Sequence, residues 1–378
     1  MLGSTPQNSP TNYSAPQLHK FNLQFIPVIS RIRRVHYIYH TLLSKGTNLC
    51  MLYGPPKCGK TVLIRQLTEQ FKLIGNTYEI LVGPVDGATE IFDKFNFEQL
   101  VTTRSTTPTL IVIDEAQCLY FLRSDQIPPG YIISNDTLSN NGRFWTLMKR
   151  FTDSVPGEPD KQFNQNLYIV LIAAYGGAAD THPGTPVDIQ CQFDMNHVLM
   201  NDDEFHQLTM AYSNVTRAQR ITDNLQQIIK SRLGCHIGLT VELLNEYREL
   251  GAALGESELI HKLLAGKVSR NLLQYRSIPK SIRNDSMYTN ELNALRKVIL
   301  YGGQCSVNLL NPTVIRQLVT RYYLTIIGGD IRFPSPLLAD TVLHMLYAPT
   351  KNYAHLNTNT TCSQFIQQAI CTMRYRIK

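Results

Sequence analysis

Two short stretches of this sequence carry residue types that could do chemistry on a phosphate. The first reads GPPKCGKT and contains Lys60 and Thr61, and the second ends in adjacent carboxylates, Asp114 and Glu115. A lysine can hold outer phosphate oxygens, a hydroxyl and an aspartate can ligate magnesium, and a glutamate can act as base for an attacking water. These four residues predict hydrolysis of a nucleoside triphosphate.

The first stretch matches G-x-x-x-x-G-K-[ST], the phosphate-binding P-loop, between an apolar run (49–53) and an apolar, helix-like run (62–67). Its glycines let successive backbone N–H groups point at phosphate oxygens, and the following helix offers its positive N-terminal end. The residues expected to hold ATP are Gly54, Pro55, Pro56, Lys57, Cys58, Gly59, Lys60 and Thr61. The alternative is a chance match to a loose pattern.

The second stretch, TLIVIDEAQ, is an unbroken apolar run before its carboxylates. Such a run is typical of a central strand in a parallel sheet covered on both faces. We expect Asp114 to hold magnesium together with Thr61, and Glu115 to orient the attacking water. The alternative, a strand that merely ends at a solvated turn, is disfavoured by the P-loop upstream.

The pattern predicts an α/β fold: a P-loop NTPase of the additional-strand type, a parallel sheet with helices on both faces. Further strands are expected over 78–84 and 168–174, and helices over 21–44, 92–100 and 143–151. In the additional-strand class the third strand often ends in a polar residue that senses the γ-phosphate. Here that position is Ala174 or Tyr175, and Tyr175 suits a buried core aromatic equally well.

The remainder of the chain is predicted to be helical and then winged-helix-like. Helices are expected over 202–212, 223–233, 240–250, 291–300 and 311–321, and a hairpin over 322–335. The turn GCHIGL contains His236, for which a structural hydrogen bond is favoured over a ligand contact. The helix before the hairpin offers only Arg316 and Arg321, which favours packing over DNA binding.

These elements predict five segments. They are a disordered tail (1–17), a P-loop NTPase core (18–200), a helical lid region (201–282), a winged-helix-like domain (283–347) and a C-terminal tail with a short helix over 364–375 (348–378).

Composition narrows the class of protein further. The net charge of +7 permits a nucleic-acid or acidic partner without requiring one, because the excess is spread along the chain. The eight cysteines form no C-x-x-C pair, which favours reduced thiols and an intracellular protein. We expect no signal peptide and no membrane span. Arg31, Arg33 and Arg34 form too small a cluster for a nuclear-localisation signal, so the nucleus and the cytoplasm both stay open.

Six blocks in order resemble the NTPase module of Crinkler-type effector proteins, within the STAND and AAA-like branch of P-loop ATPases. The resemblance spans about residues 45–340 and rests on GPPKCGKT, VIDEAQ with Tyr120, the helix carrying Trp145 and Lys149, LIAAYGG, GCHIGL and IRFPSPL. It implies an ATPase coupled to a winged-helix region, with effector roles often in a nucleus. We expect the NTPase module alone, lacking the N-terminal ubiquitin-like domain and the C-terminal nuclease-like domain that many members carry.

Four functions follow as rivals. The leading one is a magnesium-dependent ATPase in which a basic residue near Lys149, or one from a neighbouring subunit, neutralises transition-state charge. The second is a nucleotide-gated switch with little turnover that orders a helical arm against a protein partner or a second copy. A nucleic-acid-acting ATPase is weaker, because no dense basic stripe appears. A small-molecule kinase is disfavoured, because adjacent Asp114 and Glu115 suit water activation.

Overall fold

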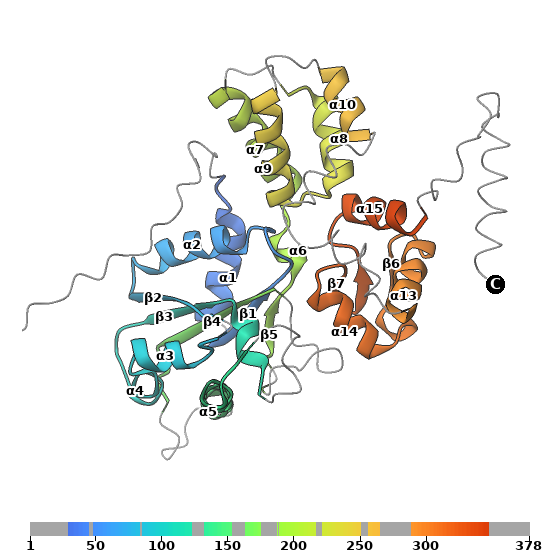
Figure 1. The fold of residues 1–378 in the computed structure, drawn as a ribbon. Coiled ribbons are helices and arrows are strands. Elements are labelled where there is room, and N and C mark those ends of the chain that lie inside the picture. The colour runs from blue at the N-terminus through green and yellow to red at the C-terminus, as the bar shows by residue number, and fades with distance from the viewer. Residues whose placement is uncertain are drawn as a thin grey trace, which may run out of the picture.

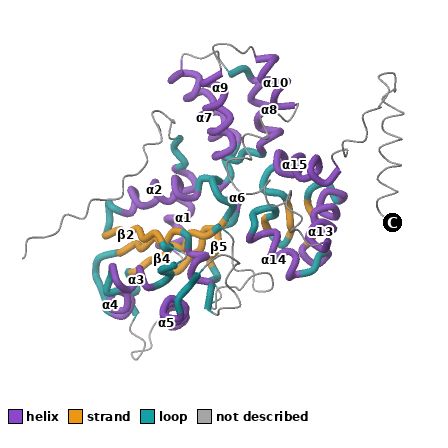
Figure 2. Tube along the Cα trace, viewed as in Figure 1, coloured by secondary structure: helices purple, strands orange, loops and turns teal. Residues whose placement is uncertain are grey.

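The protein is built from three groups of elements that follow one another along the chain (Figure 1). The computed structural model describes residues 29–44, 48–83, 85–122, 132–152, 163–174, 187, 189–216, 221–250, 256–264 and 289–347. Strands lie in two sheets, a larger one near the N-terminus and a smaller one near the C-terminus, and the middle group is helical (Figure 2).

The larger sheet has five strands in the order β2-β3-β4-β1-β5, and every neighbouring pair is parallel. The strands are β1 (Leu49–Tyr53), β2 (Asn76–Leu81), β3 (Thr109–Asp114), β4 (Leu167–Ala173) and β5 (Cys191–Phe193). Strand β4 is inserted between β1 and β3, which is the additional-strand arrangement, so the predicted fold class is confirmed. The carboxyl ends of β1, β3 and β4 therefore meet at one edge.

Helices cover both faces of this sheet, which explains the unbroken apolar strands. On one face α1 (Ile32–Ser44) and α2 (Lys60–Phe71) pack against alternate strand residues such as Cys50 and Val112. On the other face the intervening residues, such as Ile111, pack against the remaining helices. Those helices are α3 (Thr89–Lys94), α4 (Phe97–Thr102), the 3₁₀ turn η1 (Ala116–Tyr120) and α5 (Asn135–Thr152).

The middle group consists of helices around a separate apolar core. Its members are α7 (Asp202–Thr216), α8 (Asp223–Leu233), α9 (Ile237–Leu250) and α10 (Glu256–Leu264), and the short helix α6 (Met195–Val198) before them packs with Val198 into the core of the larger sheet. Helix α8 has the predicted bounds because Thr222 accepts a hydrogen bond from the backbone of Leu225, and Gly234 ends the helix at a φ of 63°. Core side chains include Leu208, Ile229 and Leu243.

The C-terminal group places helices around an antiparallel sheet of order β6-β8-β7. Its elements are α13 (Thr289–Leu300), β6 (Gln304–Ser306), η3 (Val307–Leu309), α14 (Pro312–Thr320), β7 (Thr325–Ile327), β8 (Asp330–Arg332) and α15 (Pro336–Tyr347). The pairing of β7 with β8 confirms the predicted hairpin. Arg321, one of the two arginines considered for DNA, is paired with the buried Glu291 at 3.0 Å. The winged-helix interpretation stays a prediction.

Several element bounds differ from expectation. Helix α5 begins at Asn135 rather than at residue 143, because Ser134 accepts a hydrogen bond from the backbone of Thr137 at 3.1 Å and starts the helix in a polar stretch. The single helix expected over 92–100 is two short ones, α3 and α4. The tail 1–17, Tyr175 and the helix expected over 364–375 lie outside the described residues. Among the described helices, none is both long and apolar enough to cross a membrane.

Candidate functional site

The P-loop follows β1 directly and curls back over the end of β4. The backbone N–H of Gly54 donates to the carbonyl of Ala173 at 3.2 Å. Lys57 and Gly59 both have positive φ, 62° and 99°, and these two left-handed residues turn the chain into α2, which begins at Lys60. The loop therefore lies at the N-terminal end of a twelve-residue helix, where backbone N–H groups favour an anion.

Lys60 points across the loop rather than away from it. Its ammonium donates to the carbonyl oxygens of Gly54 at 2.7 Å and Pro55 at 3.0 Å. Beneath it Cys58 is fully buried, and burial raises the pKa of its thiol, so the group at the base of the loop is uncharged. A cation held at the mouth of an amide-lined loop is the arrangement that binds phosphate.

Asp114 and Thr61 meet beside this lysine. Burial raises the pKa of Asp114, while a hydrogen bond from Thr61 and the charge of Lys60 oppose that rise. Within the described part of the chain no cluster of three metal-ligating side chains exists. Magnesium in such sites takes one or two protein ligands and completes its shell with phosphate and water. Thr61 and Asp114 are the residues that would hold it.

Glu115 lies at the sharp turn after β3, in a left-handed conformation with φ of 60°. Its backbone N–H donates to Asp114 Oδ1 at 2.8 Å, and its side chain accepts a hydrogen bond from Gln117. Gln117 is buried and its Oε1 accepts from the backbone N–H of Ala174 at 2.9 Å. One amide thus ties the carboxylate to the end of β4. Gln117 was not predicted as a site residue, although it stands two positions after Glu115 in the sequence.

The turn Gly234–Leu239 lies against the P-loop. A Cβ on Gly59 would be 2.5 Å from Ile237 Cγ2, and one on Gly238 would be 2.2 Å from the carbonyl oxygen of Lys57. His236 is buried, and its ring Nδ1 accepts from the backbone of Leu239 at 3.3 Å, so it makes the expected structural hydrogen bond. Burial, together with the charge of Lys60, lowers its pKa to about 4. The loop is therefore covered by the uncharged start of α9.

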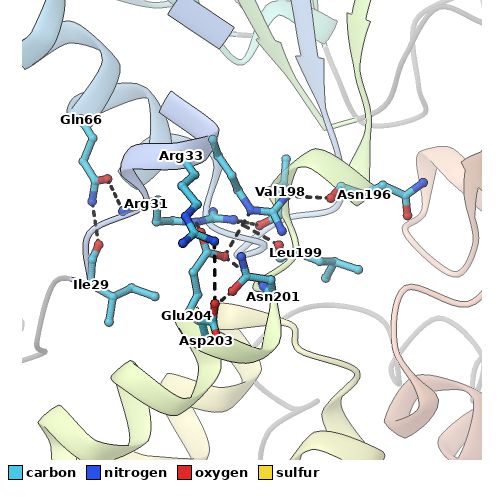
Figure 3. Close-up of polar contacts among 11 residues, drawn as sticks. Ile29, Arg31, Arg33, Gln66, Asn196, Val198, Leu199, Asn201, Asp203 and Glu204 are labelled. Atoms are coloured by element: carbon cyan, nitrogen blue, oxygen red, sulfur yellow. Dashed lines mark hydrogen bonds and ion pairs between the residues drawn. The ribbon is translucent and has the colours of Figure 1, made fainter. Parts of the chain in front are cut away.

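Arg31 joins the sheet to the helical group (Figure 3). Its fully buried guanidinium donates to the carbonyls of Val198 at 2.6 Å and Leu199 at 3.2 Å and pairs with Glu204 at 3.5 Å. Nη1 has no hydrogen-bond partner in the described part of the chain and lies 3.6 Å from where a Cβ on Gly59 would be. The arginine thus links α1, the connection to α7 and the P-loop.

Two residues quoted for the family resemblance, Lys149 and Trp145, lie on α5. Lys149 is exposed in the last turn of α5, and none of the hydrogen bonds or ion pairs between described residues joins its side chain to the P-loop. On the same helix, Trp145 is buried and its indole donates to the carbonyl of Leu119 at 2.7 Å, which fixes η1. Of the two sensor positions, Ala174 lies at the site and has no polar side chain.

A groove of about 520 Å³ runs between the start of α1 and the outer side of α2. It is lined by apolar residues such as Ile29 and Val62 and by Arg65 and Glu69. None of the P-loop residues or the two carboxylates lines it. The groove is therefore separate from the phosphate site, although Val62 follows Thr61 directly.

No protein-family model and no curated protein matches the chain. Solved structures do: the Walker-type ATPase of Pyrococcus abyssi superposes with a TM-score of 0.51 and 14% identity over 83% of this chain and 95% of its own. A RuvB mutant of Thermotoga maritima gives 0.42 and 11% over 84% and 94%, and Cdc6p of Pyrobaculum aerophilum gives 0.39 and 14% over 86% and 96%. With β4 between β1 and β3, and the P-loop between β1 and α2, the chain has the fold of a P-loop ATPase.

Proposed function

We propose that the chain binds ATP with magnesium and hydrolyses it. One observation carries the proposal: Lys60 and Thr61 of the P-loop lie beside Asp114 and Glu115 at the carboxyl edge of a parallel sheet. A cation and a hydroxyl after β1, together with two carboxylates at the end of β3, would thereby supply the phosphate contact, the magnesium ligands and the base. An anion-binding loop without carboxylates would bind phosphate but would not activate water.

Each residue then has one task. Residues 54–61 wrap the phosphates, and Lys60 leaves its two carbonyl partners to contact the outer oxygens. Thr61 and Asp114 hold magnesium, which neutralises phosphate charge. Glu115, oriented by Gln117, accepts a proton from the attacking water. The fixed amides and cations favour the charge that develops on the transferred phosphoryl group.

Two variants test the proposal. Lys60→Ala should lose ATP binding, and Glu115→Gln should retain binding while phosphate release falls by about 10²-fold or more, because positioned bases contribute 10²–10⁴-fold. Glu79→Gln, an exposed carboxylate on the neighbouring strand β2, removes the same charge and should leave turnover unchanged. Unchanged hydrolysis in Glu115→Gln would remove Glu115 from the mechanism. ATP binding by Lys60→Ala at wild-type strength would remove the loop.

A nucleotide-gated switch with little turnover is the second candidate function. The observation that favours it is Ala174, which has no polar side chain at the sensor position and whose N–H is already bound to Gln117. The switch would order the helical group against a protein partner or a second copy of the chain. Single-turnover measurements separate the candidates, because tight ATP binding with negligible phosphate release supports the switch.

The finer assignments are also proposals. A Crinkler-like effector role rests on the order of six sequence blocks alone, and with it an intracellular site in the nucleus or cytoplasm. We also propose the domain division that the sequence pattern predicts: a core over 18–200, a helical lid over 201–282 and a winged-helix-like domain over 283–347. Coupling to nucleic acid is tested by measuring ATP hydrolysis with and without single- and double-stranded DNA at two salt concentrations.

A further inference from the structure

A second lysine of the P-loop is engaged by the helical group. Lys57 Nζ donates to Glu242 Oε1 of α9 at 2.6 Å, although the two residues are 185 positions apart in the sequence. The side chains are 30% and 33% exposed, so water and ligands can reach the pair. Lys57 also has a φ of 62°, a conformation that costs a lysine energy and that the surrounding contacts must maintain.

The backbone around this ion pair is also closely packed. Gly238 of α9 lies against the carbonyl of Lys57, where even a methyl group would not fit. The charges of Lys60 and Lys57 both contribute to the lowered pKa of the neighbouring His236, so both ammonium groups lie near the start of α9. Glu242 is thus a carboxylate paired with one cation of a phosphate-binding loop, on a helix whose start lies near a second.

We propose that Lys57 is a second phosphate-binding cation which nucleotide and Glu242 compete for, so that α9 responds to nucleotide binding. The inference rests on the proposed function, because it requires phosphate in the loop. A lysine ammonium is a flexible point charge with three donors and can change partners without moving the backbone. A partly exposed ion pair contributes little to folding, so the exchange costs little. The polyphosphate carries more negative charge than one carboxylate and repels it.

A double-mutant cycle tests this competition. Glu242→Gln keeps the size of the side chain and removes its charge, so ATP should bind about threefold to tenfold more tightly. Lys57→Met should weaken binding by a similar factor. In the Lys57→Met background, Glu242→Gln should change the Kd by less than about twofold, because the shared cation is gone. The readout is the Kd of a fluorescent ATP analogue at low and high salt.

Two results would overturn the proposal. An unchanged Kd in Glu242→Gln means that Glu242 does not compete. An equal gain in both backgrounds means that Glu242 only repels the phosphates through space. Glu69→Gln is the matched control: Glu69 pairs with Lys72 at 2.6 Å on α2, outside the loop, and its neutralisation should leave the Kd unchanged. Lys60→Ala in the same series reports separately on the proposed function, since loss of binding there with no effect at Glu242 refutes only the competition.

Hydrogen exchange measures the response of α9 itself to ATP, which the Kd does not report. ATP should change the protection of amides around Glu242 in the wild-type chain, because the carboxylate loses its partner. The same addition should leave Glu242→Gln unchanged at those amides. An identical ATP-induced change in both proteins would show that α9 does not sense nucleotide through this pair.

Discussion

Replacing Gly238 with alanine tests the seating of α9 on the P-loop. A Cβ at this position would lie 2.2 Å from the carbonyl oxygen of Lys57 and 2.6 Å from its Cβ, whereas ordinary contacts begin at 3.4 Å. The helix or the loop must therefore move by about 1 Å, which a close-packed contact resists. Overpacking of this kind typically costs about 1–3 kcal/mol.

The higher helix propensity of alanine offsets part of that cost. Alanine is favoured over glycine in a helix by at most about 1 kcal/mol. The net expectation for Gly238→Ala is a loss of up to about 2 kcal/mol in the free energy of unfolding. Gly142 in the interior of α5 is the matched control, because nothing lies within 4 Å of a Cβ added there. Gly142→Ala should stabilise the protein by about 0.5–1 kcal/mol.

Urea unfolding followed by circular dichroism measures both variants against the wild type. Opposite signs for the two glycines support the close approach of α9 to the loop. If Gly238→Ala stabilises the protein as much as Gly142→Ala does, the contact with Lys57 is absent and the reasoning fails. Hydrogen exchange adds a local check, since only Gly238→Ala should lower protection at the start of α9.

Three further predictions follow from the site. Gln117→Leu should lower ATP turnover about 10-fold or more while ATP still binds, because Glu115 loses the amide that orients it; unchanged turnover would contradict that role. Arg31→Ala should lower the free energy of unfolding in urea by about 3–5 kcal/mol, since it leaves buried partners unpaired. Arg33 is 85% exposed, so Arg33→Ala should leave stability unchanged, and equal effects of the two variants would refute the role given to Arg31. Because the pKa of His236 in the folded chain is lowered to about 4, only the unfolded chain binds a proton on this ring between about pH 6.5 and 4. The free energy of unfolding should therefore fall by up to about 3 kcal/mol as the pH drops through that window, and His236→Gln should flatten this slope. An equal slope in His236→Gln would contradict the prediction.

The sheet could be predicted largely from the sequence, because its signals are local. Strands β1, β3 and β4 are continuous apolar runs, and the P-loop and the Asp114–Glu115 pair mark where two of them end. The missed elements, such as β5, β6 and α10, have only three to nine residues, too few for a periodic pattern to show. Helix α15 begins at Pro336, directly after the segment that the sequence predicts as the end of the hairpin.

The candidate site was predicted only in part. Motif spacing identified the phosphate loop and the carboxylates, but it could not show that Gly238 and Glu242 lie against Lys57, because no local pattern reports a contact between residues 185 positions apart. The role of Arg31 could not be predicted for a similar reason. Its partners are two carbonyls and a carboxylate contributed by a distant segment of the chain.

The end of β4 lies between the phosphate loop and the acidic turn. Because this strand separates β1 from β3, the phosphate loop and the acidic turn start about 10 Å apart, twice the spacing of neighbouring strands. Ala173 and Ala174 lie between them, where the carbonyl of Ala173 accepts a hydrogen bond from Gly54 of the loop and the N–H of Ala174 donates to Gln117 of the acidic turn, so the backbone of β4 joins the two turns. A change at the end of β4 would therefore reach the phosphate loop and the acidic turn together.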